Sequence, residues 1–213
     1  MKMYVITIME NERSVQVADR CISSGLKFGH YIEKHKAYTP KNCNVFQELE
    51  KLGYNEFGFR EKYSRIECCI AGFLSHHSLW LKCIELNEPI AIFEHDAVLV
   101  NDVPTLPMFD ILNLGKPSYG KYNTPNFLGY GALVSKPYFP GAHAYRITPK
   151  GAVELVNEAQ LTAGPTDVYI HSNKFTLGEY YPWVAEARDS FTTIQSTQGC
   201  YAKHNYGESY EII

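Results

Sequence analysis

Two acidic residues, separated by one position, follow an apolar run near the middle of the chain. The run covers residues 89–93, and the acids are Glu94 and Asp96, with His95 between them. Two carboxylates at the end of a strand can both face a divalent cation, and Mg²⁺ or Mn²⁺ prefers such oxygen ligands. A cation held there would neutralise charge on a departing phosphate. The pattern therefore indicates metal-assisted chemistry on a phosphate-containing substrate.

The position of this triplet after an apolar run distinguishes it from other pairs of acids. Residues 10–12 and 48–50 have the same acid-x-acid spacing, and neither triplet directly follows an apolar strand. Because the spacing itself is common, the context and not the spacing favours a metal role. The alternative interpretation of residues 94–96 is a solvated turn at the end of the strand.

Alternating strand and helix patterns predict the elements that position these acids. Apolar and β-branched runs predict strands at residues 3–8, 28–35, 89–93, 108–115, 144–147 and 181–187. Apolar periodicity and capping residues predict helices at residues 14–24, with Ser14 as the cap, and at residues 44–52, 63–86, 149–160 and 166–175. Residues 116–130 have no period and are expected to form a loop. This order is typical of an α/β fold with a largely parallel sheet, in which ligands bind at the carboxyl ends of the strands.

Length and charge limit the classes of function. A chain of 213 residues, 45% of them hydrophobic, suits one domain spanning residues 1–213. Twenty basic and 23 acidic side chains give a net charge of -3, which disfavours a nucleic acid as partner. No apolar run reaches the roughly 20 residues of a membrane helix, and the first residues do not fit a secretory signal. We therefore expect a soluble, cytoplasmic protein.

The six cysteines show none of the spacings typical of a zinc site. With no export signal in the sequence, we expect all six to be reduced thiols that mostly serve as small core side chains.

The segment at residues 69–100 resembles glycosyltransferase family 25, which includes bacterial lipo-oligosaccharide and collagen galactosyltransferases. That family has a cysteine, Ser-His, Trp and Asn-Glu-Pro before an apolar strand that ends in Glu-Asp-Asp. The corresponding residues here are Cys69, Ser75, His76, Trp80, Asn87, Glu88, Pro89, Glu94, His95 and Asp96. Further blocks resemble the family in the same order, at residues 109–115, 141–156 and 165–170, together with the opening strand and Arg13.

The resemblance implies a GT-A fold, which is Rossmann-like, and an inverting transfer of a hexose from a UDP-sugar. The donor would be UDP-glucose or UDP-galactose, and Mn²⁺ or Mg²⁺ would assist. In this scheme Asp96 is the direct metal ligand, and Glu94 reaches the donor ribose, or the metal through water. Asp167 is the candidate base that deprotonates the acceptor hydroxyl. The alternative for Asp167 is an N-cap at the start of its helix.

Further donor contacts are expected from Thr7, Arg13, Ser75 and His76, besides Glu94. Arg13 would pair with the donor diphosphate, and its alternative is a solvated arginine at the start of a helix. Ser75 and His76 either approach the donor or serve only the helix that carries them. His77 and Trp80, by contrast, are expected in the core because of their place in the helical period.

Many GT-A enzymes complete the metal shell with a histidine close to the C-terminus, and His204 has that position in this chain. His171 and His143 are the alternatives. Tyr119 and Tyr122, together with Tyr130, either stack on a sugar or simply belong to an exposed loop.

Two departures from the family bear on function. His95 replaces the middle acid of the family triplet, and the chain is shorter than typical members. We therefore keep a second reading, a non-catalytic module that binds nucleotide-sugar or glycan, and a third, a metal-dependent phosphoesterase. The acceptor, which the sequence leaves open, would be a glycan, a lipo-oligosaccharide or a protein.

Overall fold

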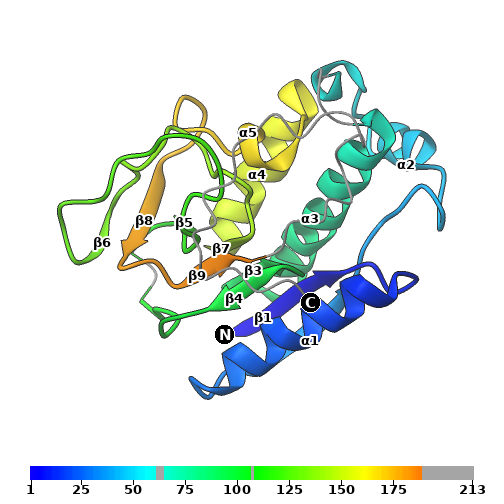
Figure 1. The fold of residues 1–213 in the computed structure, drawn as a ribbon. Coiled ribbons are helices and arrows are strands. Elements are labelled where there is room, and N and C mark those ends of the chain that lie inside the picture. Colours follow the sequence, from blue (N-terminus) through cyan, green and yellow to red (C-terminus); the bar gives the residue numbers. More distant parts are fainter. Residues whose placement is uncertain (61–64, 107, 189–213) are drawn as a thin grey trace.

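The computed structural model describes residues 1–60, 65–106 and 108–188, and the elements below lie within them (Figure 1). The strands are β1 (Lys2–Thr7), β2 (Ile32–Lys36), β3 (Ile90–Glu94), β4 (Ala97–Leu99), β5 (Ile111–Asn113), β6 (Gly129–Ala132), β7 (Ala144–Ile147), β8 (Leu177–Tyr181) and β9 (Ala185–Ala187). The helices are α1 (Glu12–Leu26), α2 (Val45–Lys51), α3 (Ile66–Leu86), α4 (Pro149–Thr162) and α5 (Thr166–Tyr169), with the 3₁₀ turn η1 (Phe57–Phe59).

A seven-stranded sheet in the order β2-β1-β3-β7-β5-β8-β6 forms the centre of the molecule. β1 is parallel to β2 and β3, and β5 is parallel to β8. β7 is antiparallel to its neighbours β3 and β5, so these two point the same way, and β6 is antiparallel to β8. β4 and β9 form a separate antiparallel pair. The predicted α/β class with a mostly parallel sheet is confirmed, and the arrangement is compatible with a Rossmann-like fold.

Helices cover both faces of this sheet, with α1 on one side and α3 and α4 on the other (Figure 1). Side chains alternate along β1 accordingly. Met3 and Val5 belong to the apolar cluster that includes residues of α1, whereas Tyr4 and Ile6 belong to the cluster formed with α3 and α4. This alternation, which has a period of two residues, decides which side chains at the strand ends can face α3.

Local capping explains most helix boundaries. Asn11, and not Ser14, caps α1, because its side chain accepts from the backbone N–H of Ser14. The predicted cap at Ser14 is therefore wrong, and the helix begins two residues earlier. At the other end of the long helix α3, Asn87 takes a left-handed conformation with φ of 50°, which stops the helix as predicted.

Three strands and the length of one helix differ from the sequence-based expectation. β4 lies where no strand was predicted, β6 begins at the end of the predicted loop, and β8 begins just after the predicted end of the helix at residues 166–175. β8 is hard to recognise because it carries Glu179, which is fully buried and accepts hydrogen bonds from the backbone N–H groups of Val134 and Ser135. α5 ends early because residues after it bond to another segment: Ser172 donates its N–H to the carbonyl of Pro137.

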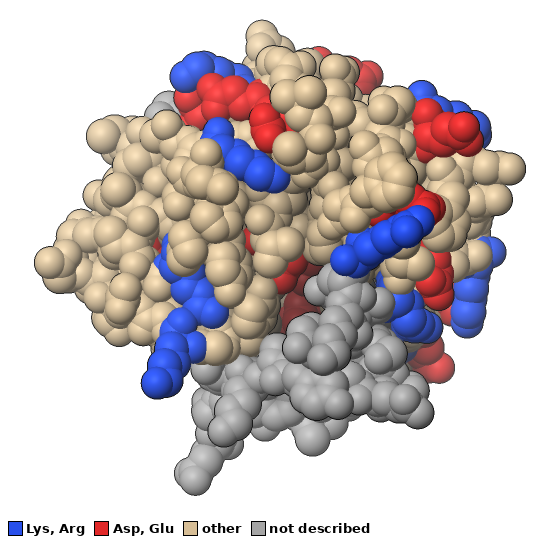
Figure 2. All heavy atoms as spheres, turned by 90° about the horizontal axis from the view of Figure 1, so that it is seen from above, with Lys and Arg blue, Asp and Glu red and all other residues tan. Residues whose placement is uncertain are grey.

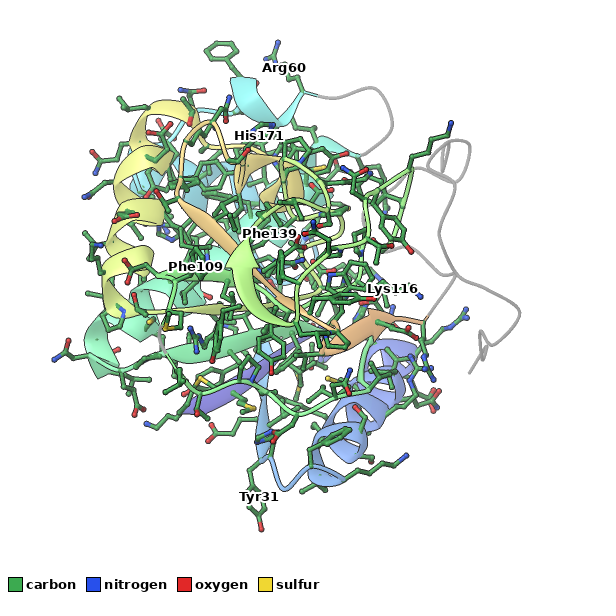
Figure 3. The ribbon with its side chains drawn as sticks, turned by 90° about the vertical axis from the view of Figure 1, so that its left-hand side faces the viewer. Tyr31, Arg60, Phe109, Lys116, Phe139 and His171 are labelled. Carbon is green, nitrogen blue, oxygen red and sulfur yellow. The ribbon has the colours of Figure 1, made fainter. Side chains whose placement is uncertain are left out.

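Figure 3 shows Phe139 near the middle of the molecule and Tyr31 projecting away from it, consistent with exposed fractions of 0% and 84%. None of the five described cysteines forms a disulfide, as expected, and the sixth, Cys200, lies outside the described residues. Among the helices of the described part of the chain, none has the length and apolar character needed to cross a membrane.

Candidate functional site

A cleft of about 370 Å³ opens at the carboxyl ends of β1, β2 and β3, where the first half of α3 faces the sheet. This is the edge at which open α/β sheets bind ligands, and the volume falls within the roughly 300–1,000 Å³ typical of small-molecule sites. Of the residues expected at the site, Ser75, His76, Glu94 and His95 line the cleft. The expected location of the site at the end of β3 agrees with this geometry.

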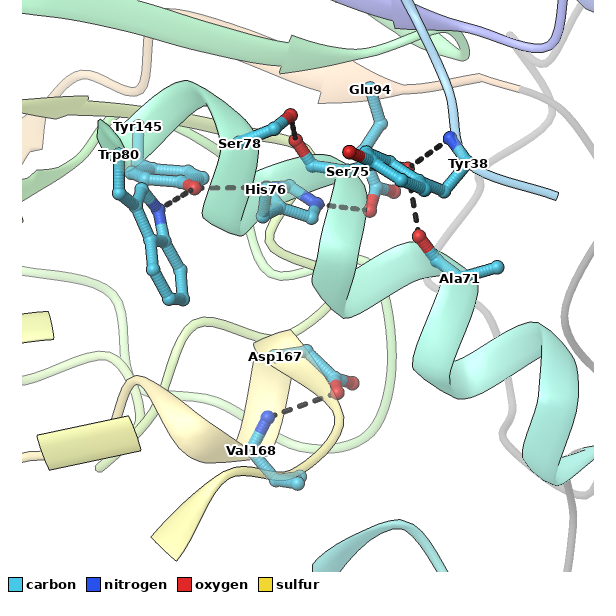
Figure 4. Close-up of polar contacts among 10 residues, drawn as sticks. All are labelled: Tyr38, Ala71, Ser75, His76, Ser78, Trp80, Glu94, Tyr145, Asp167 and Val168. Atoms are coloured by element: carbon cyan, nitrogen blue, oxygen red, sulfur yellow. Dashed lines mark hydrogen bonds and ion pairs between the residues drawn. The ribbon is translucent and has the colours of Figure 1, made fainter. Parts of the chain in front are cut away.

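Glu94 and His76 form the central contact of the cleft (Figure 4). His76 Nε2 lies 3.1 Å from Glu94 Oε1, and the other ring nitrogen, Nδ1, lies 2.9 Å from the Tyr145 hydroxyl. Glu94 continues the alternation of Ile90 and Ile92 along β3, which puts its side chain on the face covered by α3. Burial lowers the pKa of His76 to about 3, so the imidazole is neutral.

The carboxyl of Glu94 resists ionisation. Burial and, to a smaller extent, the nearby carboxylate of Asp167 raise the pKa of Glu94 to about 8. Because like charges repel, two neighbouring carboxyl groups favour the state in which only one of them is ionised. A positive group between them would allow both to ionise. The site can therefore accept a cation or a cationic group at the end of β3.

Asp167 lies at the start of α5 and takes part in two recorded hydrogen bonds. The phenol of Tyr119 donates to its Oδ2 at 2.6 Å, and the Val168 N–H donates to its Oδ1 at 2.9 Å. Pro165 occupies the cap position of α5, and no side chain caps this helix. The N-cap alternative for Asp167 is therefore wrong. Asp167 does not line the cleft, but its carboxylate is close enough to Glu94 and His76 to affect the pKa of both groups.

His95 and Asp96 turn toward α1. The Ser14 hydroxyl accepts from the Ile8 N–H at 2.9 Å, and it shares a hydrogen bond with His95 Nδ1, 2.5 Å away. Asp96 is not among the residues that line the cleft. Its carboxylate lies close enough to Cys21 of α1 to add to the burial that raises the pKa of that thiol.

Within the described residues, no three side chains of His, Cys, Asp or Glu come together in a way that could hold a metal ion. His204, the histidine expected to complete a metal shell, lies outside these residues. Of the alternatives, His143 is buried and neutral, because burial lowers its pKa to about 4. His171 lies just after α5, and its ring stacks on that of Tyr138 with the two ring centres 6.1 Å apart.

Thr7 and Arg13 do not line the cleft. Thr7 follows Met3 and Val5 in the alternation of β1, is fully buried, and donates its hydroxyl to the carbonyl of Val5 at 3.1 Å. Arg13 is half-buried in the first turn of α1, two residues after Asn11, which does line the cleft.

Ser75 joins the long helix to the loop after β2 (Figure 4). Its hydroxyl donates to the Ala71 carbonyl at 2.7 Å and accepts from the Tyr38 N–H at 2.9 Å. The bond fixes the backbone of Tyr38, whose side chain lines the cleft. The remaining hydrogen-bonding capacity of Ser75 is one lone pair of its oxygen.

The cleft residues that sequence reasoning missed include Tyr38, Lys41 and Arg65. Tyr38 and Lys41 lie in the loop after β2. Because β2 is parallel to β1, this loop lies at the same edge of the sheet as the end of β1, and this position is the signal that could have identified both residues. Figure 2 shows acidic side chains deep in a hollow near the centre of one face, with Lys and Arg side chains around it. The lining of the cleft likewise carries both charges, with the acids Glu10, Glu67 and Glu94 and the cations Lys41 and Arg65.

Comparison with known protein families identifies a match. A family model described as glycosyltransferase family 25 (LPS biosynthesis protein) matches residues 1–170, which include every element that lines the cleft. No protein with curated functional information matches the sequence.

Proposed function

The chain belongs to glycosyltransferase family 25 and is a glycosyltransferase; from the geometry of its cleft we propose an inverting transfer of glucose or galactose from a UDP-sugar to an acceptor hydroxyl, assisted by Mn²⁺ or Mg²⁺. The observation that carries the proposal is the cleft at the ends of the parallel strands, where Glu94 contacts His76 and where the nearby Asp167 adds to the rise in the pKa of Glu94. We propose that residues 1–213 form one transferase domain.

The cleft offers groups suited to a nucleotide diphosphate. Tyr38 presents an aromatic ring for a flat base, and Lys41 and Arg65 supply positive charge for phosphates. Arg13, near the cleft at the start of α1, is the further candidate for the diphosphate. Thr7 is buried on the opposite face of β1, so its contribution would require a local change in that strand.

The carboxylates at the end of β3 suit a cation that binds together with its substrate. Mg²⁺ commonly uses one or two protein carboxylates and takes its other ligands from phosphates and water. Glu94, directly or through water, would supply a protein oxygen from the cleft. Asp96 faces α1, so its carboxylate would have to turn toward the cleft to join Glu94, and His204 is the candidate for a third ligand. When bound, the cation would offset the charge that develops on the leaving diphosphate.

Asp167 is the proposed base. An inverting transfer needs one carboxylate that removes the acceptor proton while the acceptor oxygen attacks the anomeric carbon from the face opposite the diphosphate. Asp167 meets this need because the Tyr119 hydrogen bond favours its ionised form and because Glu94, with its raised pKa, does not compete for the same role.

The acceptor is proposed to be a glycan, and the description of the family favours a lipo-oligosaccharide over a protein. The net charge of -3 gives no support to a nucleic acid acceptor. A cytoplasmic location stays a prediction, which cell fractionation would test.

The decisive experiment measures UDP released from UDP-glucose and from UDP-galactose with Mn²⁺, with and without EDTA. We expect release from one donor, its loss with EDTA, and losses of about 100-fold or more in Asp96→Asn and Asp167→Asn. Asp102→Asn is the matched control, because Asp102 is exposed and pairs with His30 away from the cleft. Calorimetric binding of UDP-sugar without turnover would instead support a binding module, and release of inorganic phosphate a phosphoesterase.

A further inference from the structure

A chain of hydrogen bonds leads from the buried core to the cleft (Figure 4). It starts at Trp80 on α3, passes through Tyr145 on β7 and His76 on α3, and ends at Glu94 on β3. Trp80 and Tyr145 are fully buried, and the exposed fraction of His76 is 2%. Glu94 has a partly exposed side chain and is therefore the member of the chain that a ligand can reach.

The donor and acceptor at each contact follow from the groups involved. The indole nitrogen of Trp80 can only donate, so at 2.9 Å it gives its hydrogen to the Tyr145 oxygen. The Tyr145 hydroxyl then has its own hydrogen to donate, and His76 Nδ1, at 2.9 Å, is its one recorded acceptor within the described residues. Burial raises the pKa of Tyr145, so this hydroxyl keeps its proton.

This direction fixes the tautomer of His76. Because Nδ1 accepts the hydrogen bond from Tyr145, it carries no proton, and the ring proton sits on Nε2. Nε2–H then donates to Glu94 Oε1 at 3.1 Å. The contact holds one carboxyl oxygen of Glu94 against α3, and no hydrogen bond to its Oε2 is recorded among the described residues.

We propose that Trp80 and Tyr145 are positioning residues, which set the Nε2–H tautomer of His76 and thereby orient Glu94 in the donor cleft. The inference rests on the proposed function only where it states that Glu94 contacts the UDP-sugar. The hydrogen-bond order itself follows from the four side chains. An opposite order, in which His76 Nδ1–H donates to the Tyr145 oxygen, would leave the Tyr145 hydroxyl without an acceptor.

The first readout is the tautomer of His76 in the full chain labelled with ¹⁵N-histidine. Multiple-bond ¹H–¹⁵N spectra at neutral pH distinguish the two tautomers, and loss of signals in His76→Asn assigns them. We expect the Nε2–H form in the unmodified protein. In Tyr145→Phe the donor to Nδ1 is gone, and we expect ring shifts that indicate a mixture of tautomers. A wild-type ring protonated at Nδ1, or an unchanged spectrum in Tyr145→Phe, would overturn the proposal.

The second readout is affinity for UDP, measured by calorimetry, and KM for the UDP-sugar. Tyr145→Phe is expected to weaken UDP binding and raise KM about fivefold, the worth of one hydrogen bond, with a smaller change in kcat. Tyr54→Phe is the matched control: the Tyr54 hydroxyl lies 2.8 Å from Nε2 of His77, the neighbouring histidine, away from the cleft. An equal loss of UDP affinity in both variants would show that the effect is general destabilisation, and it would refute the positioning role.

The two readouts separate failure of this inference from failure of the proposed function. If no UDP-sugar is turned over but His76 carries its proton on Nε2 and changes in Tyr145→Phe, the hydrogen-bond chain stands and the proposed transfer from a UDP-sugar falls. If transfer is observed and the tautomer is the opposite one, the positioning role falls alone.

Discussion

The phenol of Tyr119 donates a 2.6 Å hydrogen bond to Oδ2 of Asp167, across 48 positions of the sequence. Lys136 holds the same segment: its ammonium donates to the Tyr119 carbonyl at 2.7 Å and lies 4.8 Å from the centre of the Tyr119 ring. The loop after β5 is thus attached to the candidate base. A donor aimed at a carboxylate favours its ionised form, which is the form a base needs.

Tyr119→Phe should reduce kcat/KM about tenfold near neutral pH, since a hydrogen bond to a charged group contributes roughly 1.5–3 kcal/mol. It should also move the acidic limb of the pH–rate profile to higher pH, because the ionised carboxylate loses its donor. Measurement of kcat/KM between pH 5 and pH 9 checks both effects. Tyr122→Phe, in the same loop, is the control and should leave the limb in place. A fall in activity with no movement of the limb would mean that the bond merely holds the loop.

Lys41→Ala should raise KM for the nucleotide-sugar about fivefold at low salt, because one exposed charge beside a phosphate contributes about 1 kcal/mol. The effect should shrink as salt screens the contact. Kinetics at low and high ionic strength provide the test, with Lys27→Ala as control, since Lys27 carries the same charge at the end of α1, outside the cleft. Equal effects of both variants would argue against a phosphate contact at Lys41.

The free energy of unfolding should fall as the pH drops from about 6.5 toward 4. Burial lowers the pKa of both His35 and His77 to about 4, so the folded protein keeps these rings neutral while the unfolded chain takes up protons below pH 6.5. Their contribution to the free energy of unfolding is complete above pH 6.5. Between pH 6.5 and 4 it falls by up to about 1.4 kcal/mol per pH unit for each histidine. Urea unfolding at several pH values measures the slope. His77→Gln should make it shallower, and an unchanged slope would contradict the assignment.

Gly151→Ala should destabilise the protein by about 1–3 kcal/mol, although alanine is the better helix former by about 1 kcal/mol. A Cβ at this position of α4 would lie 2.3 Å from the carbonyl oxygen of Asp110, which is backbone and cannot move aside easily. Val153→Ala, at an exposed position of the same helix, should change stability by no more than about 0.5 kcal/mol. Denaturant midpoints compare the two, and a Gly151→Ala protein as stable as the parent would show that β5 and α4 separate freely.

The sequence alone determined the class of fold and the edge of the sheet where the candidate site lies. Strand and helix periods, the start of α4 at Pro149 and the stop at Asn87 act within a few residues, so local patterns predict them well. The strand at residues 90–94 with its acids was recognisable for the same reason. β6 and β8 were not, because their short segments become strands only by pairing with each other and with β5.

Tertiary structure alone decided which side chains meet. Sequence spacing does not reveal that Glu94 shares a face with His76, that Thr7 lies on the opposite face, or that Tyr119 reaches Asp167. These relationships depend on which face of each strand α3 covers and on how distant loops close over the sheet. The order of strands and the packing of helices set both, and neither leaves a mark within any one segment of the chain.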